Sequence, residues 1–183
     1  GGGAVSVFYE QLGQLLPKGT VISIGEGENL IEKIITGNSI EEERCYLAGQ
    51  KPRKKLIHEQ PSGTIKTACN YTYIKSIWPE FDWYIEGGEY YVGVQTKRGC
   101  PHNCCFCVYT VVEGKKVRVN PVDEVIKEMK QLYDLGVRGF WFTDAQFIPT
   151  KKHIEDAKIL LQAIKDQGWN DINWAAYIRA DNI

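Results

Sequence analysis

The chain has 183 residues, which at about 150 residues per domain allows one domain and part of another. Hydrophobic residues make up 43% and charged residues 25%, the balance of a chain that buries a core, so disordered, collagen-like and low-complexity classes are excluded. Lys and Arg total 22 against 23 Asp and Glu, and this net charge of -1 gives no support for a nucleic-acid partner or an anionic membrane surface.

The first 38 residues predict a helix, a strand and a second helix. Apolar residues recur at helical spacing between Ser6 and Leu16, and the β-branched run Thr20–Ile24 is typical of a buried strand. The strand ends in a Gly-Glu-Gly-Glu sequence at positions 25–28. An amphipathic helix follows from Asn29, and Gly37 closes it where a left-handed cap is favoured.

Residues 39–89 have little periodicity and many turn residues, so we interpret them as a connector. From Tyr90 strands and helices alternate, and Asn120-Pro121 predicts a helix start with Asn120 as the cap. The predicted elements are the strand Tyr90–Gln95, a helix ending at Gly136, the strand Arg138–Thr143, the helix Lys151–Gln167 and the strand Asn173–Ile178. This rhythm favours a parallel sheet or barrel, and so few strands predict a slice of a longer enzyme.

Four of the six cysteines fall within the segment 100–107, directly after the strand that begins at Tyr90. Crowding of this kind in a cytosolic chain is typical of metal binding or redox chemistry. Cys100, Cys104 and Cys107 are separated by three and then two residues, and soft sulfur ligands select zinc, copper(I) or iron-sulfur clusters. Three thiolates would leave one iron of a four-iron cubane without a protein ligand, open to a small molecule.

Other interpretations of the cysteines explain less. A structural zinc site needs a closed set of four ligands, and the candidates for the fourth ligand are badly spaced. A redox pair of Cys104 and Cys107 leaves Cys100 unexplained. Cysteines that serve only as small buried hydrophobes would not crowd together.

The spacing of Cys100, Cys104 and Cys107 after the first strand of a βα tract resembles the defining loop of the radical S-adenosylmethionine superfamily. The resemblance implies that these three cysteines hold a 4Fe-4S cluster and that Cys105 is a bystander. It also implies that the open iron binds S-adenosylmethionine and that one electron from the reduced cluster splits the cofactor to a 5'-deoxyadenosyl radical. An electron donor such as flavodoxin or ferredoxin is then implied.

The same resemblance suggests roles for three further residues. Phe106 lies where the family often keeps an aromatic side chain near the adenine, although it could also be a core residue. Asp144 follows the second strand, where it could bind the cofactor's amino group or simply cap a loop. Arg179 follows the third strand and could pair with a carboxylate of the cofactor or substrate, or form a surface ion pair.

The sequence Gly25-Glu26-Gly27-Glu28 is not a dinucleotide fingerprint, because Leu30 replaces the third glycine and two carboxylates would repel a pyrophosphate. The tract from Gly1 to Glu28 instead resembles the end of the Rossmann-like cobalamin-binding domain of one branch of the superfamily. In that branch the Gly-Glu-Gly-Glu loop lines the cofactor. The resemblance therefore implies Gly25, Glu26, Gly27 and Glu28 as cobalamin contacts.

We therefore expect an α/β fold: the C-terminal part of a Rossmann-like cobalamin-binding domain at 1–38, a connector at 39–89, and the first three βα units of a partial TIM-type barrel at 90–183. The implied function is a cobalamin-dependent radical S-adenosylmethionine enzyme, of the methyltransferase class, acting on a small-molecule substrate. The alternatives are a radical enzyme without cobalamin and a non-catalytic zinc-binding interaction module. No apolar run reaches about 20 residues and no signal-peptide pattern opens the chain, so we expect a cytoplasmic protein without a membrane or nucleic-acid partner.

Overall fold

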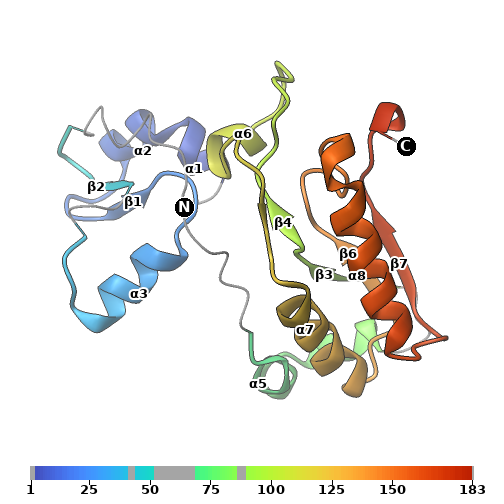
Figure 1. Ribbon diagram of the computed structural model, residues 1–183. Helices are drawn as coiled ribbons and strands as arrows, with labels where there is room; N and C mark the ends of the chain where they lie inside the picture. Colours follow the sequence, from blue (N-terminus) through green and yellow to red (C-terminus); the bar gives the residue numbers. More distant parts are fainter. Residues whose placement is uncertain (1–2, 41–43, 52–68, 86–89, 183) are drawn as a thin grey trace. The chain divides into compact units, whose positions relative to one another are not determined.

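The computed structural model describes residues 3–40, 44–51, 69–85 and 90–182 (Figure 1). The chain divides into two compact units, one made of residues 1–63 and 99–116 and the other of residues 64–98 and 117–183. The segment predicted as a connector, 39–89, lies partly outside the described residues. Within the described part, no helix is both long and apolar enough to span a membrane.

The first unit is built around a short antiparallel pair of strands, β1 (Val21–Ser23) and β2 (Cys45–Leu47). Ile22 lies opposite Tyr46 in this pair, and both side chains are buried with Ile24 and Ala48. The structure confirms the predicted strand, but β2 was assigned to the connector. β2 spans only Cys-Tyr-Leu and lacks the β-branched run that marked β1, so neither period nor composition indicated a strand.

The first predicted helix is divided into α1 (Gly3–Val7) and α2 (Tyr9–Leu15), and several of its apolar residues are exposed. Phe8 and Leu15 are 55% and 79% exposed, whereas Ser6 and Gly13 are buried. The structure therefore confirms helical structure in this segment but not one continuous helix. The small residues are buried because the Ser6 hydroxyl accepts a hydrogen bond from the Gly25 N–H and Gly13 packs against the ring of Tyr46.

Helix α3 (Glu28–Thr36) ends as the sequence predicts, at Gly37 with a left-handed φ of 70°. The N–H groups of Gly37 and Asn38 donate to the carbonyls of Ile34 and Lys33 at 3.3 and 2.9 Å, which satisfies the last turn of the helix. Of the predicted apolar face only Leu30 is buried in this structure. Helix α6 (Tyr109–Val112) completes the first unit and contacts α1.

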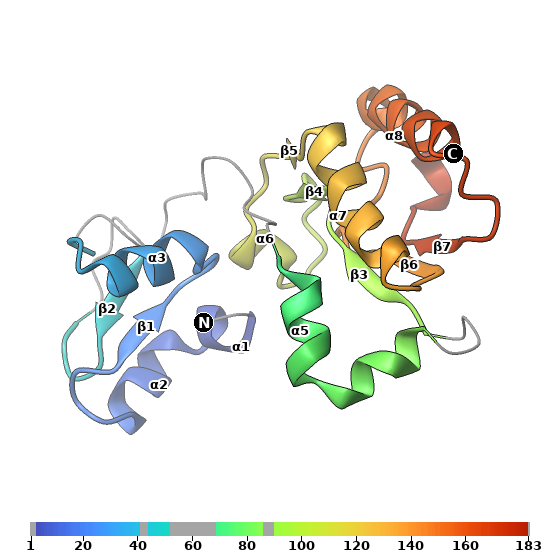
Figure 2. The same ribbon diagram turned by 90° about the horizontal axis from the view of Figure 1, so that it is seen from below.

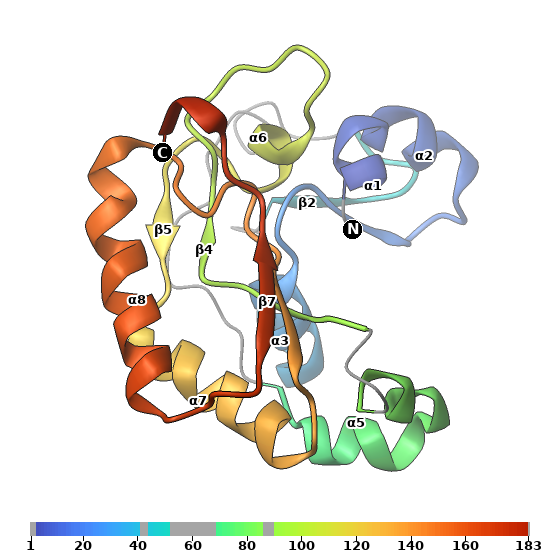
Figure 3. The same ribbon diagram turned by 90° about the vertical axis from the view of Figure 1, so that its right-hand side faces the viewer.

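The second unit contains a parallel sheet of β3 (Val92–Val94), β6 (Gly139–Phe142) and β7 (Asn173–Ala176), in the order β3-β6-β7. The register aligns Val92 with Phe140 and Phe140 with Trp174. Figure 3 shows β7 beside β6. The structure confirms the three predicted parallel strands and a mixed α/β fold. The division into a Rossmann-like part and a partial barrel stays a prediction.

Helices α7 (Val122–Asp134) and α8 (Ile154–Asp166) lie on the same face of this sheet (Figure 2). A 3-10 turn, η2 (Lys151–His153), leads into α8. The inward residues of both helices pack with Phe140 and Phe142 in one core, which includes Val125, Met129, Leu132, Ala157, Leu160 and Ile164. These buried residues recur at helical spacing along each helix, as expected for a helix that buries one face.

The predicted cap of α7 by Asn120 is wrong. The residue that precedes the helix is Pro121, and no side chain caps the first turn. The side-chain amide of Asn120 instead donates to the carbonyl of Gln95 at 2.8 Å, and its backbone N–H donates to the carbonyl of Thr96 at 2.8 Å. Asn120 is buried and joins α7 to the segment that follows β3.

Part of the predicted connector packs against the core of the second unit. Helix α5 (Tyr71–Ile77) is capped by Asn70, whose side chain accepts a hydrogen bond from the Tyr73 N–H at 2.9 Å. The 3-10 helix η1 (Pro79–Tyr84) follows and buries Phe81. A short antiparallel pair, β4 (Lys97–Arg98) with β5 (Arg118–Val119), flanks the cysteine segment, and η3 (Ala180–Asn182) follows β7.

Candidate functional site

The cysteine segment forms a loop that begins directly after β4. Gly99 has a left-handed φ of 93°, which permits the chain to turn out of the strand. The Cys100 N–H donates to the Gly114 carbonyl at 3.1 Å, so residues 100 and 114 are joined at the base of the loop. Inside the loop the Cys107 N–H donates to the Cys104 carbonyl at 3.1 Å, which places these two residues on one turn.

The thiols differ in exposure: Cys100 is buried, Cys107 is partly buried, and Cys104 and Cys105 are exposed. None of the six cysteines forms a disulfide. Among the residues that the structure describes, no three Cys, His, Asp or Glu side chains are close enough together to hold a metal ion. The three predicted ligands are therefore near each other in sequence and on one loop, but their sulfur atoms are not already gathered.

The side chains nevertheless fit the chemistry of an iron-sulfur cluster. The three cysteines lie on one loop and form no disulfide, so their thiols can supply the soft ligands that such clusters need. Gathering of ligands on metal binding is common, since binding energy is coupled to local folding. The assignment of these three cysteines as ligands and the arrangement of a loaded site both stay predictions.

Phe106, between the exposed Cys105 and Cys107, is 86% exposed. Its interpretation as a core residue is wrong. A large aromatic side chain left in solvent on the cysteine loop is available for contact with a bound molecule.

Asp144 is 1% exposed, at the carboxyl end of β6. Its Oδ1 accepts the backbone N–H groups of Thr96 at 2.7 Å and Lys97 at 2.9 Å, and its Oδ2 accepts the Thr96 hydroxyl. The Lys97 Nζ lies 3.3 Å from Oδ2. These protein groups surround the carboxylate, so the structure favours the loop-capping role of Asp144 over a bond to a cofactor amine.

Lys97 was not singled out from the sequence, and it is 2% exposed. Burial lowers the pKa of its amine from the usual value, while the neighbouring Asp144 opposes that change. The Nζ also lies 4.6 Å from the centre of the Phe147 ring. No signal marks this lysine, because an isolated Lys between a strand and a glycine turn ordinarily points to solvent.

Arg179 follows β7 and forms a two-bond pair with Asp181, from Nε to Oδ1 at 2.9 Å and from Nη2 to Oδ2 at 2.7 Å. Its side chain is 39% exposed. The structure therefore shows the surface ion pair that the sequence left as an alternative. A role of Arg179 in carboxylate binding stays a prediction.

The Gly-Glu-Gly-Glu loop joins β1 to α3 in the first unit. Gly25 is buried with a φ of 88°, and its N–H donates to the Ser6 hydroxyl at 2.8 Å. A Cβ at Gly25 would lie 2.6 Å from Arg44 Nη1 and 2.9 Å from the Val112 carbonyl oxygen. The loop thus packs directly against α6, which follows the cysteines, and only glycine fits at position 25.

The other three residues of that loop lead into α3, which begins at Glu28 with Gly27 as its cap residue. The Gly27 carbonyl accepts the first backbone bond of the helix from Ile31 at 2.9 Å. Glu28 is in the first turn, where the helix dipole favours a carboxylate. Glu26, Gly27 and Glu28 are partly exposed, so their side chains or backbone remain accessible to a ligand.

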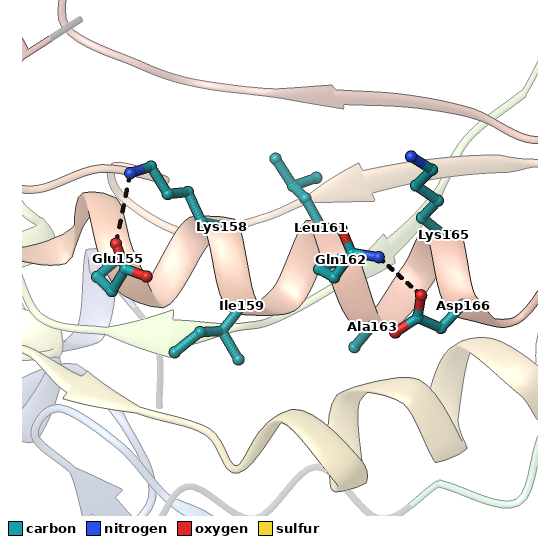
Figure 4. Close-up of a pocket in the computed structure, with 8 residues that line it drawn as sticks. All are labelled: Glu155, Lys158, Ile159, Leu161, Gln162, Ala163, Lys165 and Asp166. Atoms are coloured by element: carbon teal, nitrogen blue, oxygen red, sulfur yellow. Dashed lines mark hydrogen bonds and ion pairs between the residues drawn. The ribbon is translucent and has the colours of Figure 1, made fainter.

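A separate hollow lies along α8 and is lined by that helix alone (Figure 4). Its polar residues bond to one another: Lys158 to Glu155 at 3.4 Å and Gln162 to Asp166 at 2.7 Å. It shares no residue with the cysteine loop or the Gly25 loop. We therefore assign it no role.

Residues 94–175 match the Radical SAM superfamily. The chain is 31% identical over 160 residues to an uncharacterized methyltransferase, PH0819, from Pyrococcus horikoshii, and the match covers 86% of this chain and 34% of the relative. It is 32% identical over 69 residues to hopanoid C-2 methylase from Rhodopseudomonas palustris, covering 37% of this chain and 13% of that protein. This chain therefore spans about a third of the length of the Pyrococcus protein.

Among solved structures, the chain is similar to the radical S-adenosylmethionine methyltransferase TsrM from Kitasatospora setae with cobalamin and a 4Fe-4S cluster bound. The sequences are 20% identical, the TM-score is 0.49, and the match covers 80% of this chain and 30% of that chain.

Proposed function

Because residues 94–175 of this chain belong to the radical S-adenosylmethionine superfamily, we propose that the whole protein is an iron-sulfur enzyme that reductively cleaves S-adenosylmethionine. The observation that carries the proposal is the position of the thiols. Cys100, Cys104 and Cys107 lie on a single loop that follows β3 and β4, and β3 is the first strand of the parallel sheet. The carboxyl ends of parallel strands are where α/β enzymes bind ligands.

Cys100, Cys104 and Cys107 would hold a 4Fe-4S cluster. When bound, such a cluster supplies one electron that cleaves S-adenosylmethionine to methionine and a 5'-deoxyadenosyl radical. The chain's own residues would orient the components. The hydrogen bond from the Cys107 N–H to the Cys104 carbonyl would hold the turn between two ligands, and the exposed Phe106 would pack on the adenine. Cys105 has no ligand role in this proposal.

We further propose that the protein is cobalamin-dependent and belongs to the methyltransferase class. The Gly25–Glu28 loop supports this proposal, because it keeps a glycine where a side chain cannot fit and leaves Glu26, Gly27 and Glu28 partly exposed. Relatives named as methyltransferases are consistent with the class. The substrate is then a small molecule, the electron donor is a flavodoxin or ferredoxin, and the enzyme acts in the cytoplasm.

Two other functions are separable by experiment. One is a radical enzyme without cobalamin, in which residues 1–38 are a relic of a cobalamin domain or a binding surface. The other is a non-catalytic zinc-binding interaction module. The thiols of the cysteine loop range from buried to exposed, and this is compatible with zinc binding.

Anaerobic reconstitution of the full-length protein, followed by analysis of iron, sulfide, zinc and cobalt, tests all three. About four irons and four sulfides per chain with cobalt after cobalamin addition support the proposal in full. The same iron and sulfide without cobalt supports the enzyme without cobalamin. One zinc without sulfide would remove the enzyme function altogether.

A further inference from the structure

A buried carboxylate closes the base of the cysteine loop. Oε2 of Glu113 accepts a hydrogen bond from the backbone N–H of Gly99 at 2.9 Å, fourteen residues earlier in the chain. Glu113 is 8% exposed, as is Cys100, the next residue after Gly99. The neighbouring bond from the Cys100 N–H to the Gly114 carbonyl, at 3.1 Å, forms the second half of the closure.

The position of Glu113 is itself fixed by α6. Its backbone N–H donates to the Tyr109 carbonyl at 2.8 Å, so the residue ends that helix. Left-handed glycines lie at both ends of the closure, with φ of 93° at Gly99 and 81° at Gly114. The helix therefore holds the Glu113 carboxylate in place. The two glycines allow the backbone at each end of the closure to adopt the left-handed conformation that the hydrogen bonds require.

A carboxylate is costly to bury, and its hydrogen bond to a backbone N–H is stronger than a neutral one. An apolar residue at position 113 would avoid that cost but would leave the buried Gly99 N–H without its acceptor. The bond restrains the backbone next to Cys100, the only one of the three proposed ligands that is buried in the described structure. Closing a loop at its base also lowers the entropy that is lost when the loop is ordered around a metal centre.

We propose that Glu113 is a positioning residue that holds Cys100 in place for cluster ligation, an inference that rests on the proposed function. It contacts no cofactor. It restrains the start of the loop, so that assembly of the site has only to order Cys104 and Cys107.

Alkylation of single thiols in the metal-free, reduced full-length protein tests the restraint directly. In Glu113→Ala the rate of Cys100 modification by iodoacetamide should rise about tenfold or more, because a charge-assisted bond is lost and an N–H is orphaned. Cys45 is 5% exposed in β2 of the same unit and is the internal control, so its rate should not change. An unchanged Cys100 rate would overturn the proposal.

Glu113→Gln provides the matched variant, because an amide oxygen can still accept the Gly99 N–H. Its Cys100 rate should stay within about threefold of the wild type. If Glu113→Ala also exposes Cys45, Glu113→Gln decides the question. Slow alkylation of Cys100 in Glu113→Gln supports the proposal, whereas faster alkylation of Cys100 alone in that variant overturns it. Exposure of Cys45 in both variants would also overturn it, because Glu113 would then support the whole unit and not the loop.

Iron uptake separates this inference from the proposed function. With iron and sulfide limiting, Glu113→Ala should bind less iron than the wild type, and Glu113→Gln should bind nearly as much. Wild-type protein that binds iron fully, together with an unaltered Glu113→Ala, would contradict the positioning role alone. Wild-type protein that binds no cluster would remove the proposed function and with it the ligand role of Cys100.

Discussion

Asp144 and Lys97 form an ion pair inside the second unit, with the Lys97 Nζ 3.3 Å from Asp144 Oδ2 and both side chains at most 2% exposed. Asp144 lies two residues after the end of β6, and Lys97 begins β4, three residues before Cys100. The same carboxylate accepts the Lys97 backbone N–H at 2.9 Å. The pair therefore ties the second strand of the parallel sheet to the segment that leads into the cysteine loop.

Replacing Asp144 with Ala should destabilise the protein by about 3–5 kcal/mol, because it leaves the Lys97 ammonium buried and unpaired. Urea unfolding measures the change. Asp134→Ala is the control, since Asp134 pairs with Lys130 at 2.6 Å but both side chains are more than half exposed. Asp134→Ala should lower the free energy of unfolding by less than about 1 kcal/mol. Equal losses of unfolding free energy in the two variants would show that the buried pair stabilises the protein no more than the exposed pair does.

Gly25→Ala should destabilise the first unit more than Gly19→Ala. Both glycines have left-handed backbones, with φ of 88° and 86°, so both substitutions carry similar strain. A Cβ at Gly19 meets nothing within 4 Å, whereas one at Gly25 would be 2.9 Å from the Val112 carbonyl oxygen. The difference in free energy of unfolding isolates the packing contribution, which should be about 1–3 kcal/mol. Equal losses would mean that the loop does not pack on α6 as described.

Glu128 on α7 should make the second unit less stable as pH rises. Burial raises the pKa of its carboxyl above the ordinary value of 4.5, and the Tyr71 hydroxyl, which donates to Oε1 at 2.5 Å, partly opposes this. A raised folded pKa means that the native state binds more protons than the unfolded state, from about pH 4.5 up to the folded pKa. The stabilisation is therefore complete below that window and is lost as pH rises through the folded pKa.

The pH dependence of the urea midpoint measures this effect. Glu128→Gln should flatten the fall in stability above about pH 4.5, because the group no longer titrates. Glu124→Gln, an exposed substitution on the same helix, should leave the slope of the wild type unchanged. A wild-type slope that persists in Glu128→Gln would assign the effect to another group.

Replacing Cys100, Cys104 or Cys107 singly with Ala should abolish release of 5'-deoxyadenosine by the reconstituted full-length protein. Each substitution removes one of only three protein ligands of the proposed cluster. Cys105→Ala is the matched control, since its thiol is exposed and adjacent to Cys104, and it should largely keep activity. Equal loss at Cys105 would overturn the ligand assignment.

The sequence predicted the elements that depend on periodicity and helix termination. Helices α7 and α8 and the strands β3, β6 and β7 have regular patterns or flanking turn residues, and Gly37 ends α3 as expected. The short strands β2, β4 and β5 were missed, because each has two or three residues and none lies within a longer run of β-branched or aromatic residues like those that contain β1 and β3. The side chain of Asn120 was assigned to a cap because Asn-Pro commonly begins helices, but a tertiary bond to the Gln95 carbonyl was more favourable.

The candidate site could be predicted only where its residues form a pattern that is rare in protein sequences. Three thiols at close spacing identify a soft-metal loop, whereas a single Glu or Lys is common and usually lies on the surface. Glu113 and Lys97 are buried through contacts with Gly99 and Asp144, residues that are 14 and 47 positions away in the chain. Such pairs depend on the fold, so no local pattern could reveal them.

We propose that the three-cysteine loop holds a cluster with one iron open to S-adenosylmethionine. Electron paramagnetic resonance of the dithionite-reduced, reconstituted full-length protein tests this claim most directly. We predict the signal of a reduced 4Fe-4S cluster, whose g values shift when S-adenosylmethionine is added because the cofactor coordinates the open iron. A cluster signal that the cofactor leaves unchanged, or no such signal from protein that retains all three cysteines, would contradict the account.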